Sequence, residues 1–172
     1  ELHLPTIALR GLVVFPNNLV HFEVGREKSI AAVEWAMANN SNVFLVAQKS
    51  MDTTEPQQAD LFSYGVVAEV KQVLRVSGDL VKVLVEGKYR AKLSALDASG
   101  DFLLSEVRPA PVRAGKADDA VETEALLRAL KAGFDEYLGM NPRLGKDVVF
   151  AIVSSDDPAF LSEYMPANLL FR

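Results

Sequence analysis

The sequence contains no cysteine and only two histidines among its 172 residues. The absence of cysteine excludes a disulfide framework and a thiolate metal site. It also suits a reducing compartment, so we expect a cytoplasmic protein. His3 and His21 have no carboxylates spaced to complete a metal site with them. We therefore expect no metal and no other cofactor, and we interpret both histidines as surface or edge-strand residues.

Long apolar runs are also missing. No run approaches the roughly 20 residues that a membrane-spanning helix needs, and the N-terminus has no basic region followed by an apolar core. We therefore expect no membrane partner. The chain begins with Glu1 rather than methionine and ends in Leu-Leu-Phe-Arg, an apolar end that would be poorly tolerated as a free tail. We expect it to be a piece of a longer protein.

Nucleotide-binding and catalytic motifs are incomplete. A P-loop needs G-x-x-x-x-G-K-[ST], but residues 25–29 (GREKS) have no glycine adjacent to the lysine. Residues 139–147 (GMNPRLGKD) have one residue too many between the glycines and an aspartate in place of the magnesium-binding hydroxyl. The serines at 154–155 lack the G-x-S-x-G context of a nucleophile. We therefore expect no catalytic residue in this chain.

The apolar pattern changes its period near residue 113. Before that point, alternating apolar residues bounded by turn residues predict strands, and after it apolar residues recur at helical spacing. We predict strands at 4–9, 19–24, 42–48 and 101–107, a hairpin within 66–93, a polar surface loop at 49–60, and helices at 27–39, 119–138, 147–153 and from 158 onwards. This pattern is typical of an α+β protein with a small, nearly closed β-barrel and one packed helix at 1–113, a linker at 109–116, and an all-α subdomain at 117–172.

The same periodicity predicts which side chains face the core and where helices begin. We expect these apolar side chains to point inward: Ile30, Val33, Met37, Val66, Ala68, Val70, Leu74, Val76, Tyr89, Ala91 and Leu93. We expect a bend at Gly87, because glycine in a strand often marks a bulge. Asp119 with Glu122 should open the first C-terminal helix, and Asp157 with Pro158 should open the last one, which Pro166 should kink.

An ordered set of motifs resembles the N-terminal domain of Lon ATP-dependent proteases. The residues that carry the resemblance are 4–16 (LPTIALRGLVVFP), 24–29 (VGREKS), 45–49 (LVAQK), 55–61 (EPQQADL), 65–68 (GVVA), 82–90 (KVLVEGKYR) and 156–170 (DDPAFLSEYMPANLL). The resemblance covers nearly the whole chain. It departs at Ala8, where a proline is common, and at Pro166, which interrupts a helix that is usually continuous.

The resemblance implies a PUA-like β-barrel followed by a helical bundle. It also implies a non-catalytic substrate-recognition and assembly part of a cytosolic protease. The ATPase module and the Ser-Lys dyad of such a protease lie C-terminal to this stretch. The implied partners are unfolded or damaged proteins and other Lon subunits.

A second interpretation is a stand-alone Lon-domain protein that binds RNA or a small molecule. Lys82, Lys88, Arg90 and Lys92 form a basic stripe, and PUA-like barrels elsewhere bind RNA. However, the chain has a net charge of −5, and a solvated outer sheet face explains the same residues. We therefore expect no nucleic acid as a partner. A third interpretation, a complete enzyme, lacks the required motifs.

Two segments are candidate contact sites. Residues 12–15 are consecutive apolar residues after Gly11, and they cannot all point inward if the segment is extended. We therefore expect a weak binding patch for unfolded polypeptide, formed by Leu12, Val14, Phe15 and Pro16. The alternative is that these side chains complete the core.

The second candidate is the charged corner Arg26-Glu27-Lys28 at the start of the predicted helix 27–39. We expect it to lie beside the sheet and to pair with a neighbouring subunit. A solvated helix end is the alternative interpretation.

Overall fold

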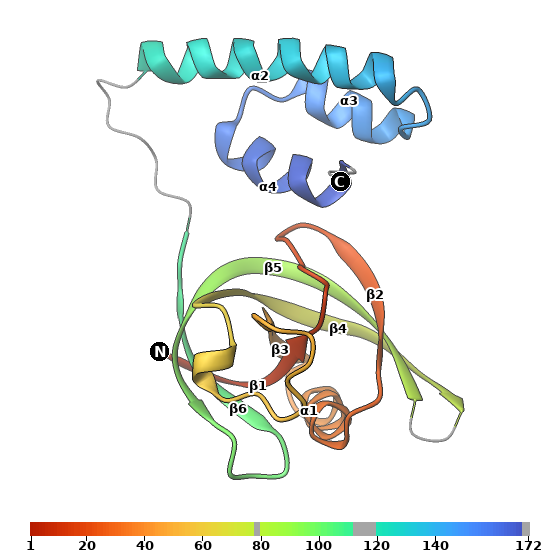
Figure 1. Cartoon of the computed structure of the whole chain (residues 1–172), viewed down its shortest axis with the longest axis vertical. Helices are drawn as coiled ribbons and strands as arrows, with labels where there is room; N and C mark the ends of the chain where they lie inside the picture. The colour runs from red at the N-terminus through yellow and green to blue at the C-terminus, as the bar shows by residue number, and fades with distance from the viewer. Residues whose placement is uncertain (78–79, 112–119, 170–172) are drawn as a thin grey trace. The chain divides into compact units, whose positions relative to one another are not determined.

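The protein is represented by a computed structural model that describes residues 1–77, 80–111 and 120–169 (Figure 1). The chain divides into two compact units, Glu1–Pro111 and Val112–Arg172. We call them the sheet unit and the helical unit and describe each by itself. The predicted domain limits at 113 and 117, most of the predicted linker, the turn at 78–79 and the capping residue Asp119 lie outside the described residues. These features stay predictions.

Each strand and helix expected from the sequence has a counterpart in the structure. The sheet unit contains β1 (Leu2–Leu9), β2 (Leu19–Val24), α1 (Glu27–Ala38), β3 (Asn42–Ala47), the 3-10 turn η1 (Gln58–Asp60), β4 (Tyr64–Ser77), β5 (Leu80–Asp97) and β6 (Leu103–Pro109). The helical unit contains α2 (Ala120–Met140), α3 (Lys146–Ser154) and α4 (Pro158–Asn168). The η1 turn lies in the segment that we predicted to be a loop.

The strands form one mixed sheet in the order β2-β5-β4-β3-β1-β6, and β5 also pairs with β6. β1 and β3 run parallel, whereas the other paired strands are antiparallel. Because β5 pairs with both β4 and β6, the pairings of five strands close into a cycle, and β2 joins β5 outside that cycle (Figure 1). The described part of the chain is therefore a mixed sheet with four helices.

β3 lies between two hydrophobic clusters of the sheet unit. Its side chains alternate, so Val43 and Leu45 belong to one cluster and Phe44 and Val46 to the other. All four are at most 2% exposed. A strand that is buried on both faces reads as a continuous apolar run, as this one does.

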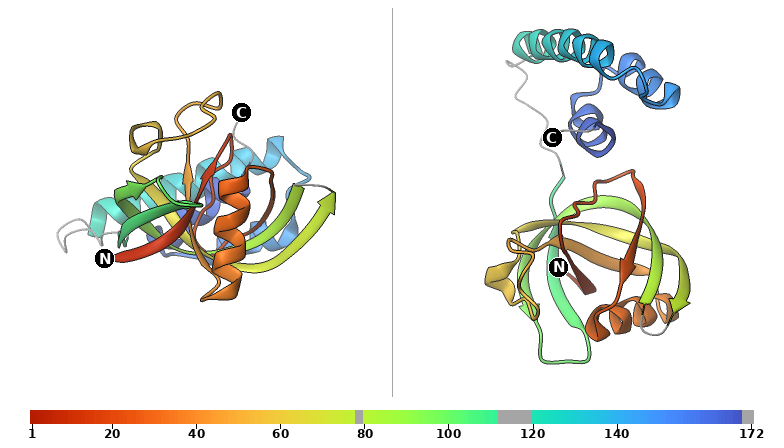
Figure 2. Two further views of the ribbon diagram at one scale, coloured as in Figure 1. Left: turned by 90° about the horizontal axis from the view of Figure 1, so that it is seen from below. Right: turned by 45° about the vertical axis from the view of Figure 1, so that its right-hand side comes forward.

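α1 packs against the sheet near β1 and β3 (Figure 2). Its buried residues are Ser29, Ala32, Val33 and Ala36, which follow the spacing of one helix face. Val33 was predicted to face inward, but the prediction for Met37 was wrong, because its side chain is 43% exposed. Small side chains occupy most of the buried face and let the helix approach the strands closely.

The hairpin of β4 and β5 contains register shifts that the sequence pattern did not reveal. One shift lies where Ala68 pairs with Gly87 and Val67 with Tyr89. A Cβ atom at position 87 would lie 2.2 Å from the carbonyl oxygen of Phe15, so this close approach requires glycine. The predicted inward orientation of Tyr89 is wrong, because its side chain, next to this bulge, is 39% exposed.

A second shift lies between Val70 and Gln72 in β4. Beyond it, Val73 packs partly on the core, whereas Leu74 and Val76 are 51% and 55% exposed. The predicted inward orientation of Leu74 and Val76 is therefore wrong. Val66, Ala68 and Val70, which precede this shift, are buried as predicted, and so are Ala91 and Leu93 in β5.

The helical unit has one small core of buried residues from all three helices: Phe134, Ile152, Leu161, Met165 and Leu169. The Asp157 side chain accepts a hydrogen bond of 2.9 Å from the Ala159 amide, which confirms the predicted N-cap of α4. α4 continues through Pro166 to Asn168, so this proline does not end the helix.

Candidate polypeptide-binding surface

The segment between β1 and β2 is held in place by its backbone. Gly11 has a φ of +63°, which glycine adopts without strain and which turns the chain away from β1. Farther along, the Asn17 amide donates to the Gly87 carbonyl and the Gly87 amide donates to the Asn18 carbonyl, both at 2.9 Å. Residues 12–16 therefore lie on a fixed scaffold next to β5.

The structure places the predicted patch residues in different environments. Val14 is 4% exposed and belongs to the core, and Pro16 is also buried. Leu12 and Phe15 are half-buried. The residue of this segment that faces water is Val13, with 59% exposure, and the sequence analysis did not select it. The alternation is that of an extended strand, so the buried Val14 leaves its two neighbours closer to the surface.

Val13, Val14 and Phe15 line one side of a groove of about 500 Å³. Two aromatic residues that precede or open β4, Phe62 and Tyr64, line it as well and are 51% and 57% exposed. We call these five residues together the apolar groove. The lining is largely apolar, and Arg90 adds a cationic side chain.

The aromatic side of the apolar groove depends on the residue that follows Tyr64. A Cβ atom at Gly65 would lie 2.3 Å from the carbonyl oxygen of Leu45 and 2.6 Å from the Phe44 ring. Only glycine lets β4 begin this close to β3. The sequence analysis missed Phe62 and Tyr64, although two aromatic residues two positions apart in a polar stretch just before a predicted strand could have indicated them.

The three residues of the charged corner also differ from one another. The Arg26 guanidinium is half-buried and donates to Gln48 Oε1 at 2.8 Å and to the Ala8 carbonyl, so it joins the start of α1 to β1 and to the residue after β3. Glu27 is exposed, and the exposed Lys28 donates to the Ala98 carbonyl at 2.5 Å. Arg26 therefore stabilises the sheet unit by hydrogen bonds within it.

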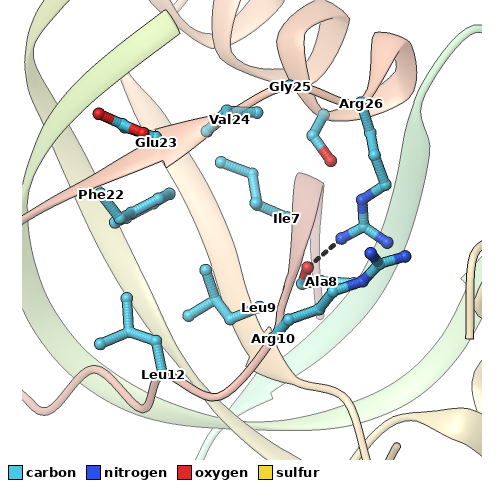
Figure 3. A pocket seen from close by; sticks show the side chains of 11 residues that line it. Ile7, Ala8, Leu9, Arg10, Leu12, Phe22, Glu23, Val24, Gly25 and Arg26 are labelled. Carbon is cyan, nitrogen blue, oxygen red and sulfur yellow. Dashed lines mark hydrogen bonds between the residues drawn. The ribbon is translucent and has the colours of Figure 1, made fainter. Parts of the chain in front are cut away.

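A second hollow of about 310 Å³ lies beside this corner (Figure 3). Its lining shares Leu9 with the lining of the hollow that contains the apolar groove. Side chains from the end of β1, from Leu12 and from the end of β2 line the second hollow, together with Arg10 and Arg26. Burial and, to a smaller extent, the charge of Arg10 lower the pKa of the Arg26 guanidinium from its ordinary value. We call this hollow the arginine pocket.

The basic stripe on β5 is partly neutralised by acidic neighbours. Lys88 lies 2.8 Å from Glu69 and 2.7 Å from Glu86, and Lys71 lies 2.8 Å and 2.9 Å from the same two carboxylates. Hydrogen bonds from Lys71 and Lys88 lower the pKa of Glu69 to about 2. This network favours a solvated sheet face over a phosphate-binding face.

Two further searches cover the described ranges only. Residues 1–77, 80–111 and 120–169 contain no group of three or more histidine, aspartate or glutamate side chains that could hold a metal ion. None of the helices in these ranges is long and apolar enough to cross a membrane.

Comparison with known protein families decides to which family the chain belongs. The family described as the ATP-dependent protease La (LON) substrate-binding domain matches residues 3–172. The chain belongs to this family. The resemblance to Lon N-terminal domains that its motifs indicated is thereby confirmed.

Curated relatives of this Lon-family chain are Lon proteases. The Lon protease of Desulforamulus reducens is 36% identical over 169 residues, which are 98% of this chain and 20% of the relative. The Lon protease of Escherichia coli K12 is 37% identical over 169 residues, which are 98% of this chain and 21% of that protein. The chain thus spans about a fifth of the length of these relatives.

Solved structures share the fold of this Lon-family chain. The N-terminal domain of Mycobacterium avium complex Lon protease superposes with a TM-score of 0.69 at 21% identity, covering 95% of this chain and 81% of that structure. A Lon N-terminal domain protein from Xanthomonas campestris gives a TM-score of 0.52 at 15% identity, covering 99% of this chain and all of that one. At these identities the likeness concerns the fold alone.

Proposed function

We propose that this chain is the non-catalytic substrate-recognition and assembly domain of a cytoplasmic, ATP-dependent Lon protease, and that it holds unfolded or damaged proteins in the apolar groove. The observation that carries the proposal is the exposure of Val13, Phe62 and Tyr64 around one hollow of about 500 Å³. Exposed apolar surface of this kind marks protein-contact sites. Unfolded chains expose the apolar side chains that a groove of this kind would cover.

The groove suits weak and unselective binding. Its side chains come from two segments held by close backbone packing at Gly65 and Gly87, so little ordering is required when a client binds. A contact of this size is smaller than a stable protein interface. Several copies in one oligomer would raise avidity by about 10²–10⁴. In this proposal the parent protein is a homo-oligomeric serine endopeptidase whose ATPase and Ser-Lys modules act on clients that several such domains hold.

Two finer assignments belong to the same proposal. The closed cycle of strand pairings supports a PUA-like barrel for the sheet unit, followed by a helical subdomain. Contact with a neighbouring subunit is assigned to Glu27 and Lys28, which are exposed at the start of α1. Arg26 contributes to that contact by fixing the position of the helix end.

Binding of unfolded casein to the purified chain tests the proposed groove. Val13→Ser and Tyr64→Ser should each weaken binding by about threefold or more, because each removes apolar area from the contact. Val76→Ser is the matched control, because Val76 is 55% exposed on β4 and lies outside the groove. Equal casein affinity of the Val13 and Val76 variants would overturn the proposal, provided that both keep the melting temperature of the parent chain.

A further inference from the structure

The arginine pocket lies between two strand edges. The pairing of β1 with β6 ends at Thr6, and Ile7–Leu9 pair with β3 on one side. β2 pairs with β5 and is an edge strand of the sheet. The end of β1 and the end of β2 therefore face each other across the pocket (Figure 3). A strand edge offers backbone hydrogen-bonding groups to an extended peptide.

Within the described residues, neither Arg10 nor Arg26 forms an ion pair with a carboxylate. Arg10 donates to the Thr53 carbonyl at 2.8 Å, and Arg26 donates to Gln48, Ala8 and, at 3.4 Å, the Thr54 carbonyl. All these acceptors are neutral. Glu23 also lines the pocket, but Figure 3 shows its carboxylate pointing away from both guanidinium groups, which lie side by side.

Two adjacent guanidinium groups with neutral partners favour an anion. Within the described residues, the hydrogen bonds of Arg10 and Arg26 use one and three N–H groups, and each guanidinium has five. N–H groups therefore remain for a ligand on both side chains. A carboxylate is the group that guanidinium geometry fits with two parallel hydrogen bonds.

The remaining lining is apolar and sets the size of the ligand. In Figure 3, Leu12 and Phe22 lie on the side of the pocket opposite the two guanidinium groups, and Ile7 lies between them. The volume of about 310 Å³ is near the lower limit of small-ligand sites. It is about twice the 150 Å³ of an apolar cavity that accepts a benzene-sized group. One apolar side chain together with one carboxylate fits this space.

We propose that the arginine pocket binds the C-terminal carboxylate of an extended polypeptide whose last residue is apolar. The α-carboxylate is one bond from the Cα that carries the last side chain, so both groups can enter the pocket together. An internal residue would need space for the chain to enter and to leave the pocket, whereas a C-terminal residue needs space for one segment only. Arg10 and Arg26 bind the carboxylate, and Leu12 and Phe22 contact the side chain. This inference rests on the proposed function, because it names a feature by which a client is recognised.

Three labelled hexapeptides test the inference by fluorescence anisotropy with the complete chain. The first ends in Phe-Leu with a free carboxylate, the second is its C-terminal amide, and the third is an amide with an internal glutamate. The free acid should bind about tenfold more tightly than either amide, because the amides lack the terminal charge that both guanidiniums contact. Equal affinity of the free acid and its amide would overturn the inference. Recovery of affinity by the internal glutamate would overturn the assignment to a chain end.

Arg10→Gln places the effect at this pocket. The glutamine side chain can still donate a hydrogen bond towards the loop at 49–60. The variant should bind the free-acid peptide about tenfold more weakly than the parent chain does, and its affinity for the amide peptide should be unchanged. Arg75→Gln is the control with the same charge change, because Arg75 is ion-paired with Glu34 at an exposed position away from the pocket. Equal loss in both variants would indicate a general effect of charge and would overturn the inference.

The casein assay separates this inference from the proposed function. If the chain binds casein but shows no preference for the free-acid peptide, the inferred carboxylate site is overturned and the proposed function of the apolar groove stands. If the chain prefers the free-acid peptide but does not bind casein, the proposed function of the apolar groove is overturned and the carboxylate site stands. Arg26→Lys gives a second check, because it keeps the charge and loses the bidentate geometry, and it should also reduce the preference for the free acid.

Discussion

The sheet unit and the helical unit build their cores in different ways. In the sheet unit, two clusters fill the space on both faces of β3, and strands far apart in sequence contribute to each. In the helical unit, five buried residues form the centre, whereas Met140, Phe150 and Leu126 are 75%, 74% and 64% exposed. The sheet unit therefore buries most of the apolar side chains of its strands, and the helical unit leaves several of its largest ones in water.

This difference bears on where a binding surface can lie. A groove or pocket keeps its shape only if the residues that line it are fixed by packing and backbone hydrogen bonds. The apolar groove and the arginine pocket both adjoin strands that are held by ladder pairs and by close approaches at Gly65 and Gly87. The helical unit has one core of five buried residues, whereas the sheet unit has two larger clusters. We therefore expect the helical unit to be the less stable of the two.

The largest expected effect tests this difference in stability. The units comprise 111 and 61 residues, for which about 6–17 and about 3–9 kcal/mol of unfolding free energy are typical. Phe44→Ala and Phe134→Ala each remove a buried ring and should cost about 3–5 kcal/mol. Phe134→Ala should therefore remove most of the stability of the helical unit and lower the 222 nm circular dichroism signal of its helices, while Phe44→Ala lowers the melting temperature of a unit that stays folded at 25 °C. A common shift of one single transition in both variants would show that the two units are not independent.

An intermediate effect separates buried from exposed positions within the sheet unit. Val14→Asn places an amide in the core and should cost about 3 kcal/mol, equivalent to roughly 10 °C or more in melting temperature. Val13→Asn changes a side chain that faces water and should stay within about 0.5 kcal/mol. Differential scanning calorimetry of the two variants measures the contrast. A similar loss in both would mean that residues 12–16 pack differently from the structure described above.

The smallest expected effect concerns the ion-pair network of the sheet face. Hydrogen bonds from Lys71 and Lys88 lower the pKa of Glu69 from 4.5 to about 2. Because the folded-state pKa is depressed, the stabilisation is present above pH 4.5 and is lost as the pH falls from 4.5 towards 2. The melting-temperature difference between the parent chain and Glu69→Gln should therefore be small near neutral pH and should shrink over that window. A difference that stays constant from pH 6 to pH 2.5 would contradict the role of these contacts.

Much of the secondary structure followed from local patterns. The period-two alternation located β2 at Leu19–Val24, and Asp157 followed by Pro158 located the start of α4. These patterns are reliable because each depends on neighbouring residues alone. The predicted inward positions of Leu74 and Val76 failed because one extra residue in β4 after Val70 reverses the side chains that follow it. The prediction for Tyr89 failed next to the bulge at Gly87, whereas Ala91 and Leu93 beyond it are buried as predicted.

The candidate sites were only partly predictable. The sequence indicated that residues 12–16 could not all be buried, but it did not show that Val14 faces the core and Val13 faces water. It placed Arg26 in a surface corner, whereas the guanidinium contacts Ala8 and Gln48. Both outcomes depend on residues that are distant in sequence.

The sequence alone determined the α+β order of elements, the family and most element boundaries, because these depend on periodicity, capping residues and ordered motifs. The tertiary structure decided where the sheet closes on itself and which side chains share a hollow. Phe62 and Tyr64 meet Val13 because Gly65 lets β4 start against β3, and Arg10 meets Arg26 because the ends of β1 and β2 face each other. Such contacts arise from close backbone approach between distant segments, and no local pattern encodes them.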